Sequence, residues 1–179
     1  MARKDGKIFQ ESFENSCKRE GVFCTRIKDQ YVPPDLRDKV PVTKNKYDFF
    51  IYQKPYLFPV ELKSIRKKSF SFSEHIIKQH QIDALTEASK YDGVIPGFIF
   101  NFRLANNKTF FVHINDFNEY KYIAENGIKD HKYKSKVNKS SISLGICEEI
   151  GMEIKNQLKR TKYHYFIDDF IRRATEKYG

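Results

Sequence analysis

The run of residues from Val94 to Phe102 constrains the fold more than any other feature of the chain. It is almost continuously apolar, yet it is far shorter than the roughly 20 residues that span a bilayer. A short apolar run that follows a turn signal, here Asp92-Gly93, is typical of a buried β-strand. We therefore expect a strand inside the protein at 94–102.

The remaining elements follow from apolar periodicity. Phe9, Phe13 and Cys17 recur at i, i+4 and i+8 and predict one apolar stripe on a first helix. On such patterns helices are expected at residues 6–20, 72–89, 116–125, 148–159 and 164–176. Strands are expected at residues 22–28, 47–53, 56–64, 94–102 and 108–115. This order predicts an α/β fold with a mixed sheet flanked by helices.

Composition limits the partners of the chain. With 179 residues, 40% of them hydrophobic, the chain suits a single domain over 1–179 with a real core. Its formal net charge of +10 points to a polyanion, either nucleic acid or an anionic membrane. No apolar run is long enough to cross a membrane, and residues 1–14 lack the apolar centre of a signal peptide. The three cysteines, an odd number without metal-ligand spacing, suit reduced thiols in a cytoplasmic protein.

Two basic segments are candidates for phosphate contact. Residues 30–46 contain three prolines among charged residues, so they form a loop or an excursion from the sheet. Residues 129–139 are rich in lysine, and a solvated loop is an equal alternative there. The candidate DNA-binding residues in the two segments are Arg37, Lys39, Lys44, Lys46, Lys132, Lys134 and Lys136.

The two strands at 47–53 and 56–64 carry the chemistry. Glu61 and Lys63 are separated by one residue, so in a strand they point to the same face. Asp48 opens the preceding strand, and a hairpin that turns near Pro55 brings it beside Glu61. Two adjacent carboxylates repel unless a cation lies between them.

Magnesium is the first choice of cation at this site, with Mn²⁺ as a substitute, because it accepts carboxylate oxygens and keeps several waters. It would polarise a phosphate oxygen and lower the pKa of a bound water. Lys63 would orient that water or neutralise the charge that develops on the phosphate. The alternative is that Glu61 and Lys63 form an ordinary ion pair on an exposed edge.

At this point the chain resembles a known family. Asp48 followed by Glu61-Leu62-Lys63 resembles the PD-(D/E)xK nuclease signature, and the wider sequence resembles the RecU-type Holliday junction resolvases, phage versions included. The further segments that carry the resemblance are 6–9, 69–72, 80–82, 93–98 and 142–145. It implies a restriction-endonuclease-like fold and a homodimer that cuts four-way DNA junctions in recombination and repair. It also implies Asp48 and Glu61 as metal ligands and Lys63 as the catalytic lysine.

The chain departs from this family in two places. The family usually has a glutamate on the first helix where this chain has Gln10, so Gln10, Glu11 or Glu14 is a candidate to complete the site. Glu11 and Glu14 are equally well explained as solvated helix residues. The excursion before Asp48 is also shorter than the stalk of the cellular resolvases, which bears on junction selectivity. Gln81, on the helix after Lys63, is a further candidate, with an exposed glutamine as the alternative.

Overall fold

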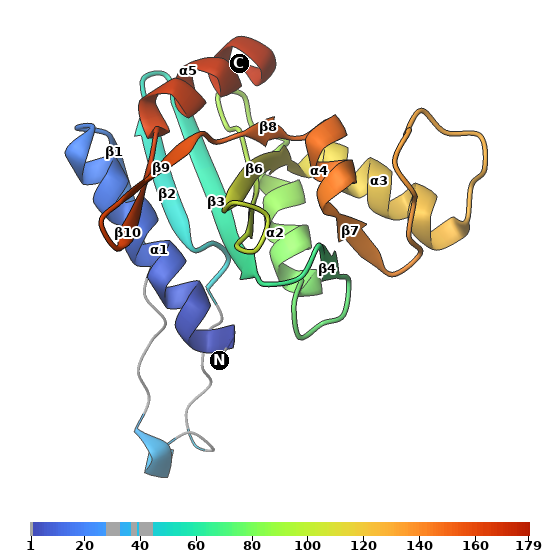
Figure 1. Ribbon diagram of the computed structural model, residues 1–179, viewed down its shortest axis with the longest axis horizontal. Helices are drawn as coiled ribbons and strands as arrows, with labels where there is room; N and C mark the ends of the chain where they lie inside the picture. Colours follow the sequence, from blue (N-terminus) through green and yellow to red (C-terminus); the bar gives the residue numbers. More distant parts are fainter. Residues whose placement is uncertain (1, 28–32, 37–38, 40–44) are drawn as a thin grey trace.

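The computed structural model describes residues 2–27, 33–36, 39 and 45–179 of the protein (Figure 1). The helices are α1 (Ala2–Arg19), α2 (Gln79–Ala88), α3 (Ile114–Asn126), α4 (Leu144–Ile150) and α5 (Ile167–Tyr178), with a 3-10 turn η1 (Pro34–Leu36). The strands are β1 (Phe23–Arg26), β2 (Phe49–Gln53), β3 (Tyr56–Ile65), β4 (Ser69–Ser71), β5 (Gly97–Phe102), β6 (Lys108–His113), β7 (Ser141–Ser143), β8 (Met152–Glu153), β9 (Asn156–Lys159) and β10 (Lys162–Tyr165).

Six of these strands form the central sheet, in the order β1-β2-β3-β5-β6-β8. β3 and β5 run parallel, whereas the other neighbouring strands run antiparallel. Parallel neighbours need a crossover connection, and α2 lies in the connection between β3 and β5. The predicted class, an α/β fold with a central mixed sheet flanked by helices, is confirmed. It is the architecture that the resemblance implies.

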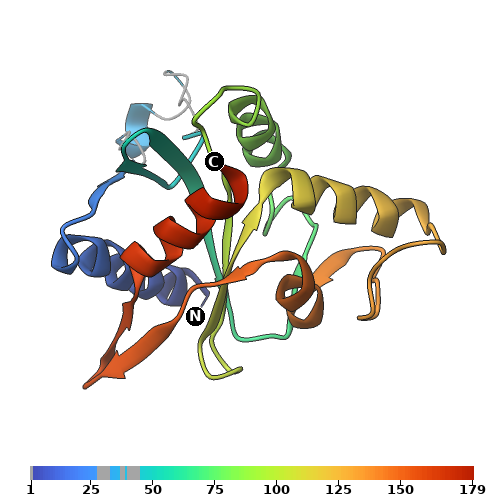
Figure 2. The same ribbon diagram turned by 90° about the horizontal axis from the view of Figure 1, so that it is seen from above.

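The helices cover the two faces of this sheet. α1 and α5 lie on one side, and α2, α3 and α4 lie on the other (Figure 2). Phe9, Phe13 and Cys17 of α1 are buried against the first face, as their spacing predicts. Phe98 and Phe100 of β5 are buried under the opposite layer. The two layers fix which side chains of each strand reach α1 and which reach α2.

The hairpin that carries the candidate chemistry is present at the predicted place. β2 and β3 pair antiparallel, with Phe49 opposite Val60. β5 is buried along its whole length, as expected. It begins at Gly97 rather than at Val94, because Pro96 has no N–H to donate to the neighbouring strand.

The helix expected at residues 72–89 was wrong in its first part. Residues 72–78 instead form bends and turns that follow β4, a strand paired with β7, and the helix begins only at Gln79. The Ser71 hydroxyl accepts a hydrogen bond from the Ser73 backbone N–H at 3.1 Å. Such local side-chain bonds offer the backbone an alternative to a helix.

The helix expected at residues 148–159 was also wrong. α4 ends at Ile150, and Met152, Glu153 and Ile154 then alternate between buried and exposed, which is the pattern of a strand. The chain continues into β9 and β10, an antiparallel hairpin that is separate from the central sheet. The last helix therefore begins at Ile167 rather than at His164.

Two simpler expectations concern the cysteines and the membrane. Cys17, Cys24 and Cys147 are all free of disulfide bonds; Cys17 and Cys147 are buried and Cys24 is half-buried. Among the described residues, no helix is long and apolar enough to cross a membrane.

A substitution at Gly97 tests the packing between β5 and β6. A Cβ atom there would lie 2.5 Å from the Val112 carbonyl oxygen and 2.6 Å from the Phe111 ring. We expect Gly97→Ala to lower the free energy of unfolding by about 1–3 kcal/mol, the usual cost of overpacking a core. Gly6→Ala is the control, because nothing lies within 4 Å of its Cβ position and alanine favours helices by about 0.5–1 kcal/mol. Urea unfolding measures both; equal midpoints for Gly97→Ala and the native protein would contradict the packing described.

Candidate catalytic centre

The Asp48 side chain lies where β2 begins. Its backbone N–H donates to the Val60 carbonyl oxygen at 3.1 Å, which places it beside β3. Its Oδ2 atom accepts a hydrogen bond from the Leu62 backbone N–H at 2.9 Å. The carboxylate therefore contacts β3 directly, and its position is fixed by the pairing of the two strands.

Glu61 and Lys63 project from β3 toward α2, as their spacing predicts. Val60 and Leu62, which alternate with them, are buried in the layer under α1. The Lys63 Nζ atom donates to Glu61 Oε1 at 2.9 Å. This ion pair is not on an exposed edge, because the Glu61 and Lys63 side chains are 5% and 14% exposed.

Gln81 connects the lysine and the glutamate. It lies in the first turn of α2 and is buried. Its Oε1 atom accepts from Lys63 Nζ at 2.8 Å, and its Nε2 atom donates to Glu61 Oε1. The alternative that Gln81 is an exposed glutamine is therefore wrong, because its side chain points from α2 into the polar cluster. Asp48, Glu61, Lys63 and Gln81 thus form one polar cluster between β2, β3 and α2.

Burial is the main influence on the pKa values of the two carboxyl groups. Burial raises the pKa of Glu61 to about 7, and the negative charge of Asp48 contributes in the same direction. The Lys63 ammonium and the hydrogen bonds from Lys63 and Gln81 offset part of this rise. Burial likewise raises the pKa of Asp48, against hydrogen bonds with Leu62, Gln10 and Glu61 and the charge of Lys63. At neutral pH the pair therefore resists carrying two full negative charges.

The three candidates on α1 are placed differently. Gln10 contacts the centre through its hydrogen bond with Asp48, and its Oε1 atom accepts from Arg26 Nη2 at 2.5 Å. Glu11 is exposed. Glu14 pairs with Lys18 on the same helix at 2.8 Å. Of the three, only Gln10 has a contact with the carboxylate pair.

The donor set fits a small, hard divalent cation. Asp48 and Glu61 supply carboxylate oxygens whose repulsion a cation would relieve. Among the residues that the structure describes, no group of three or more His, Cys, Asp and Glu side chains is arranged to hold a metal. Magnesium often binds through only one or two carboxylates, with waters and substrate phosphate completing its shell. The two carboxylates are therefore the residues that would hold Mg²⁺ or Mn²⁺.

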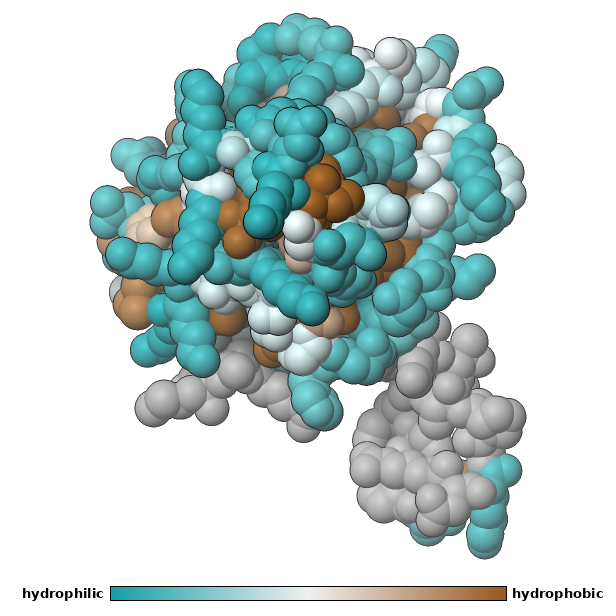
Figure 3. Space-filling view, turned by 90° about the vertical axis from the view of Figure 1, so that its right-hand side faces the viewer, coloured by the Kyte–Doolittle hydropathy of each residue, from teal (hydrophilic) through white to brown (hydrophobic). Residues whose placement is uncertain are grey.

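The candidate DNA-binding residues lie on two different parts of the chain. Arg37 and Lys44 fall outside the described residues, as does most of 30–46; Lys39 and Lys46 are exposed. Lys132, Lys134 and Lys136 are exposed on the loop after α3. The face of the molecule seen from the right-hand side of Figure 1 is mostly hydrophilic, with smaller apolar patches (Figure 3). Lys132 is already paired with Glu119 at 2.8 Å.

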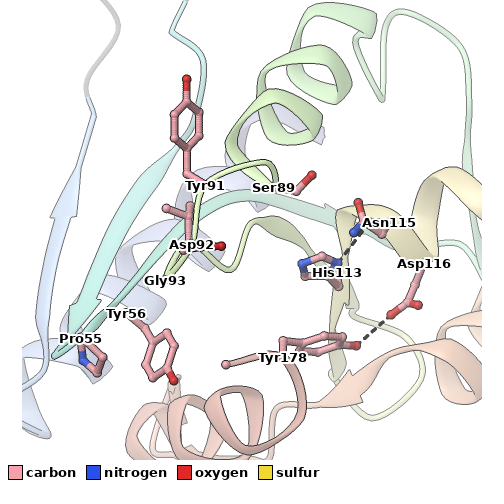
Figure 4. A pocket seen from close by; sticks show the side chains of 12 residues that line it. Pro55, Tyr56, Ser89, Tyr91, Asp92, Gly93, His113, Asn115, Asp116 and Tyr178 are labelled. Carbon is pink, nitrogen blue, oxygen red and sulfur yellow. Dashed lines mark hydrogen bonds between the residues drawn. The ribbon is translucent and has the colours of Figure 1, made fainter.

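A cavity of about 910 Å³ opens at the other end of β3, near Tyr56 (Figure 4). Tyr178 donates to Asp116 Oδ2 at 2.8 Å there, and the His113 ring stacks on Tyr178. Burial lowers the pKa of His113, so this imidazole favours its neutral form. Among the described residues, those that line the cavity include Asp92 and Asp116 but no Lys or Arg. Such a lining does not suit phosphate, so the cavity is a poor match for a DNA-binding surface.

Glu61 should make the stability of the metal-free protein depend on pH. Its pKa is 4.5 ordinarily and about 7 in the folded protein, so the folded state holds this proton more tightly than the unfolded state. The resulting stability is complete below about pH 4.5 and is lost as the pH rises through about 7. The difference between the two pKa values corresponds to roughly 3 kcal/mol in the free energy of unfolding.

Between about pH 5 and pH 8 the free energy of unfolding of the native protein should fall by up to about 3 kcal/mol. In Glu61→Gln, which has no carboxyl group to titrate at this position, we expect this fall to be absent. Urea unfolding in the presence of a chelator measures it. Glu11→Gln, an exposed carboxyl on α1, is the matched control and should follow the native protein. An unchanged pH profile for Glu61→Gln would contradict the description of the carboxylate pair.

Comparison with known proteins adds the following. No protein-family model matches the chain. A solved structure of Hjc from Archaeoglobus fulgidus, described as a Holliday junction resolvase from an archaeal hyperthermophile, is 10% identical with a TM-score of 0.48, over 82% of this chain and 93% of that one. The SPbeta prophage-derived uncharacterized protein YotM of Bacillus subtilis (strain 168) is 51% identical over 167 residues, which cover 93% of this chain and 85% of that protein. At that identity and coverage, the chain belongs to the same family as YotM.

Proposed function

We propose that the protein is a magnesium-dependent DNA endonuclease of the RecU-type Holliday junction resolvases. The observation that carries the proposal is the cluster itself. Asp48 and Glu61 are brought together beside Lys63 in a buried corner of the sheet, at the positions that the nuclease signature requires. The net charge of +10 supports it, because a nuclease must approach a polyanion.

Asp48 and Glu61 would hold the cation through their carboxylates. A bound Mg²⁺ would supply Lewis-acid polarisation of a phosphate oxygen and a water of lowered pKa. The Leu62 N–H holds Asp48 Oδ2 in place, and the Gln81 amide holds Glu61 Oε1. Both carboxylates are therefore oriented before any ligand binds, which lowers the reorganisation needed in the reaction.

Lys63 is the group that would meet the reacting phosphate. Its Nζ atom is fixed by Glu61 at 2.9 Å and by Gln81 at 2.8 Å. An ammonium has three N–H donors, so one remains for a substrate oxygen. In this site Lys63 neutralises the charge that develops on the phosphate, and Gln81 acts as a positioning residue for Lys63.

Selection of four-way junctions is the finer part of the proposal. A homodimer would place two such sites on a junction that is itself nearly two-fold symmetric. Phosphate contacts give affinity but little selectivity, so shape must supply the preference. The basic segment at residues 30–46 lies in the sequence between β1 and β2, just before Asp48, and is our candidate for the element that enters a branched substrate.

One experiment separates this proposal from its alternatives. Purified protein is incubated with a labelled four-way junction and with a duplex of the same sequence, with magnesium or with chelator. Magnesium-dependent cuts in the junction, resistant to excess duplex, support the resolvase. Cleavage of both substrates alike would indicate a nuclease for other branched or duplex DNA. Binding without cleavage would indicate a DNA-binding protein on the same scaffold.

Removing either carboxylate should abolish cleavage without weakening DNA binding. Asp48→Asn and Glu61→Gln each remove a charge that the cation needs, and neither removes a positive charge that faces phosphate. Calcium should support binding without turnover, because its looser coordination positions the attacking water poorly. Gel-shift titration in calcium and cleavage in magnesium measure the two properties. Native activity in either variant would rule out the assigned metal site.

Lys63 and Gln81 should affect rate more than affinity. Lys63→Ala should lower the cleavage rate by roughly 10²- to 10³-fold, the usual cost of losing one group that stabilises transition-state charge. Gln81→Ala should cost roughly 10- to 100-fold, as expected for a residue that orients others. Gln79→Ala is the control, since Gln79 lies on the same helix but is exposed and bonds Asp83. Single-turnover rates at saturating DNA give the comparison; if affinity falls as far as rate, Lys63 is a phosphate anchor rather than a catalytic residue.

A further inference from the structure

The β9–β10 hairpin is a surface element with no part in the catalytic centre. It is a two-stranded sheet of its own, in which Lys159 pairs with Lys162 and Tyr165 with Asn156. It packs against α1 on the side of the molecule that also carries β1 (Figure 1). Tyr163 and Tyr165 of β10 pack against the apolar layer under α1. Its far end, at residues 158–162, is exposed.

The far end of the hairpin is strongly basic. Lys159, Arg160 and Lys162 fall within four residues, and all three are exposed. Within the described parts of the chain, none of the three has an ion-pair partner. By contrast Lys90, Lys108 and Lys121 each pair with a glutamate. The hairpin therefore presents uncompensated positive charge.

Two local features of this turn are unfavourable for the isolated protein. Lys159 and Lys162 stand directly opposite one another, and like charges at such a pair destabilise a hairpin. Arg160 has a φ of 58°, a left-handed conformation that glycine, asparagine and aspartate adopt more readily. Departures from local rules tend to mark functional positions. A polyanion bound at the turn would offset the repulsion between the two lysines.

A groove of about 300 Å³ lies between this hairpin and α1. Its lining includes Ser12, Asn15 and Arg19 of α1 and Lys162 of β10. The described residues that line it include no Asp or Glu, although Lys18, which also lines it, is paired with Glu14. Hydroxyl, amide and cationic groups in one groove are the donors that typically contact DNA phosphates.

We propose that the β9–β10 hairpin and this groove bind the backbone of a DNA arm outside the catalytic centre. The inference rests on the proposed nuclease function. Gln10, which contacts Asp48, and Arg19 are nine residues apart on α1, which is about 13 Å along the axis and half a turn around it. DNA that fills the catalytic centre thus reaches the hairpin across α1. At about 3.4 Å per base pair, the phosphates bound there lie roughly four or more base pairs from the cut.

The test removes the charges of the hairpin. The variant carries Lys159→Gln, Arg160→Gln and Lys162→Gln; the matched control carries Lys90→Gln, Lys108→Gln and Lys121→Gln. Binding to a four-way junction is measured in calcium at several salt concentrations. If each cation contacts one phosphate, the hairpin variant loses about 2.7 from the slope of log affinity against log salt. The ratio of native affinity to variant affinity should then fall by roughly 40-fold as the salt concentration rises from about 50 to 200 mM.

A hydroxyl-radical footprint locates the contact. Native protein should protect backbone positions on the arm that the variant leaves exposed, whereas protection at the cut and the single-turnover rate at saturation should not change. Thermal unfolding should show the variant at least as stable as native protein, because the Lys159–Lys162 repulsion is gone. Arg160→Asn, which suits the positive φ, is a second variant that should keep the fold and weaken binding.

The outcomes separate this inference from the proposed function. Native protein that cuts junctions while the hairpin variant keeps its affinity and footprint overturns the inference alone. A loss no greater than that of the control variant does the same. Native protein that neither binds nor cuts DNA overturns both proposals. Hairpin-dependent binding of RNA or of phosphatidylglycerol vesicles, but not of DNA, would show that the hairpin serves a different polyanion.

Discussion

The burial of the Glu61 carboxyl beside Asp48 is the interaction on which the candidate catalytic centre depends. A buried charge costs several kcal/mol unless partners compensate it. Here a different structural feature positions each partner. Lys63 is supplied by the alternation of one strand, and the Leu62 N–H by the pairing of β2 with β3. Gln81 is supplied by the crossover that carries α2 back over β3. The mixed sheet is therefore needed for the proposed chemistry, because its strand pairing and its crossover helix bring these partners to one place.

The parts of the fold that the sequence predicts are those set by local periodicity. Phe9, Phe13 and Cys17 predict the buried face of α1, and the β2–β3 hairpin follows from two short runs joined at Pro55. The two wrong helix predictions, at residues 72–89 and 148–159, concern segments where short polar side chains or strand pairing compete with helix formation. The Ser71 hydroxyl accepts a hydrogen bond from the Ser73 backbone N–H where the expected helix would begin. Residues 152–154 have the alternation of a strand, but it is only three residues long and becomes decisive only beside β6.

The residues of the candidate site likewise fall into two groups, those that the sequence pattern predicts and those that it does not. Asp48, Glu61 and Lys63 are predictable because two strands and one turn fix their relation. The position of Gln81 depends on where the crossover helix begins, and the expected helix began at residue 72 instead of 79. The basic hairpin is missed for a related reason: residues 156–159 are expected in a helix that ends before Lys162, so no strand pairing between Lys159 and Lys162 is predicted. Contacts between elements are what the sequence pattern does not contain.

Gln10 shows how the centre accommodates a change of ligand type. Arginine has only N–H donors, so the 2.5 Å contact from Arg26 requires the Gln10 oxygen to face it. The Gln10 amide nitrogen is then the atom free to donate to Asp48, and this hydrogen bond lowers the pKa of that carboxyl. A glutamate at this position would add a third acidic group beside two buried carboxyl groups whose pKa values burial already raises. An amide instead stabilises the ionised form of Asp48 without adding charge. In the proposed cation site Asp48 and Glu61 would therefore be the two carboxylate ligands, and Gln10 would orient Asp48 rather than bind the cation itself.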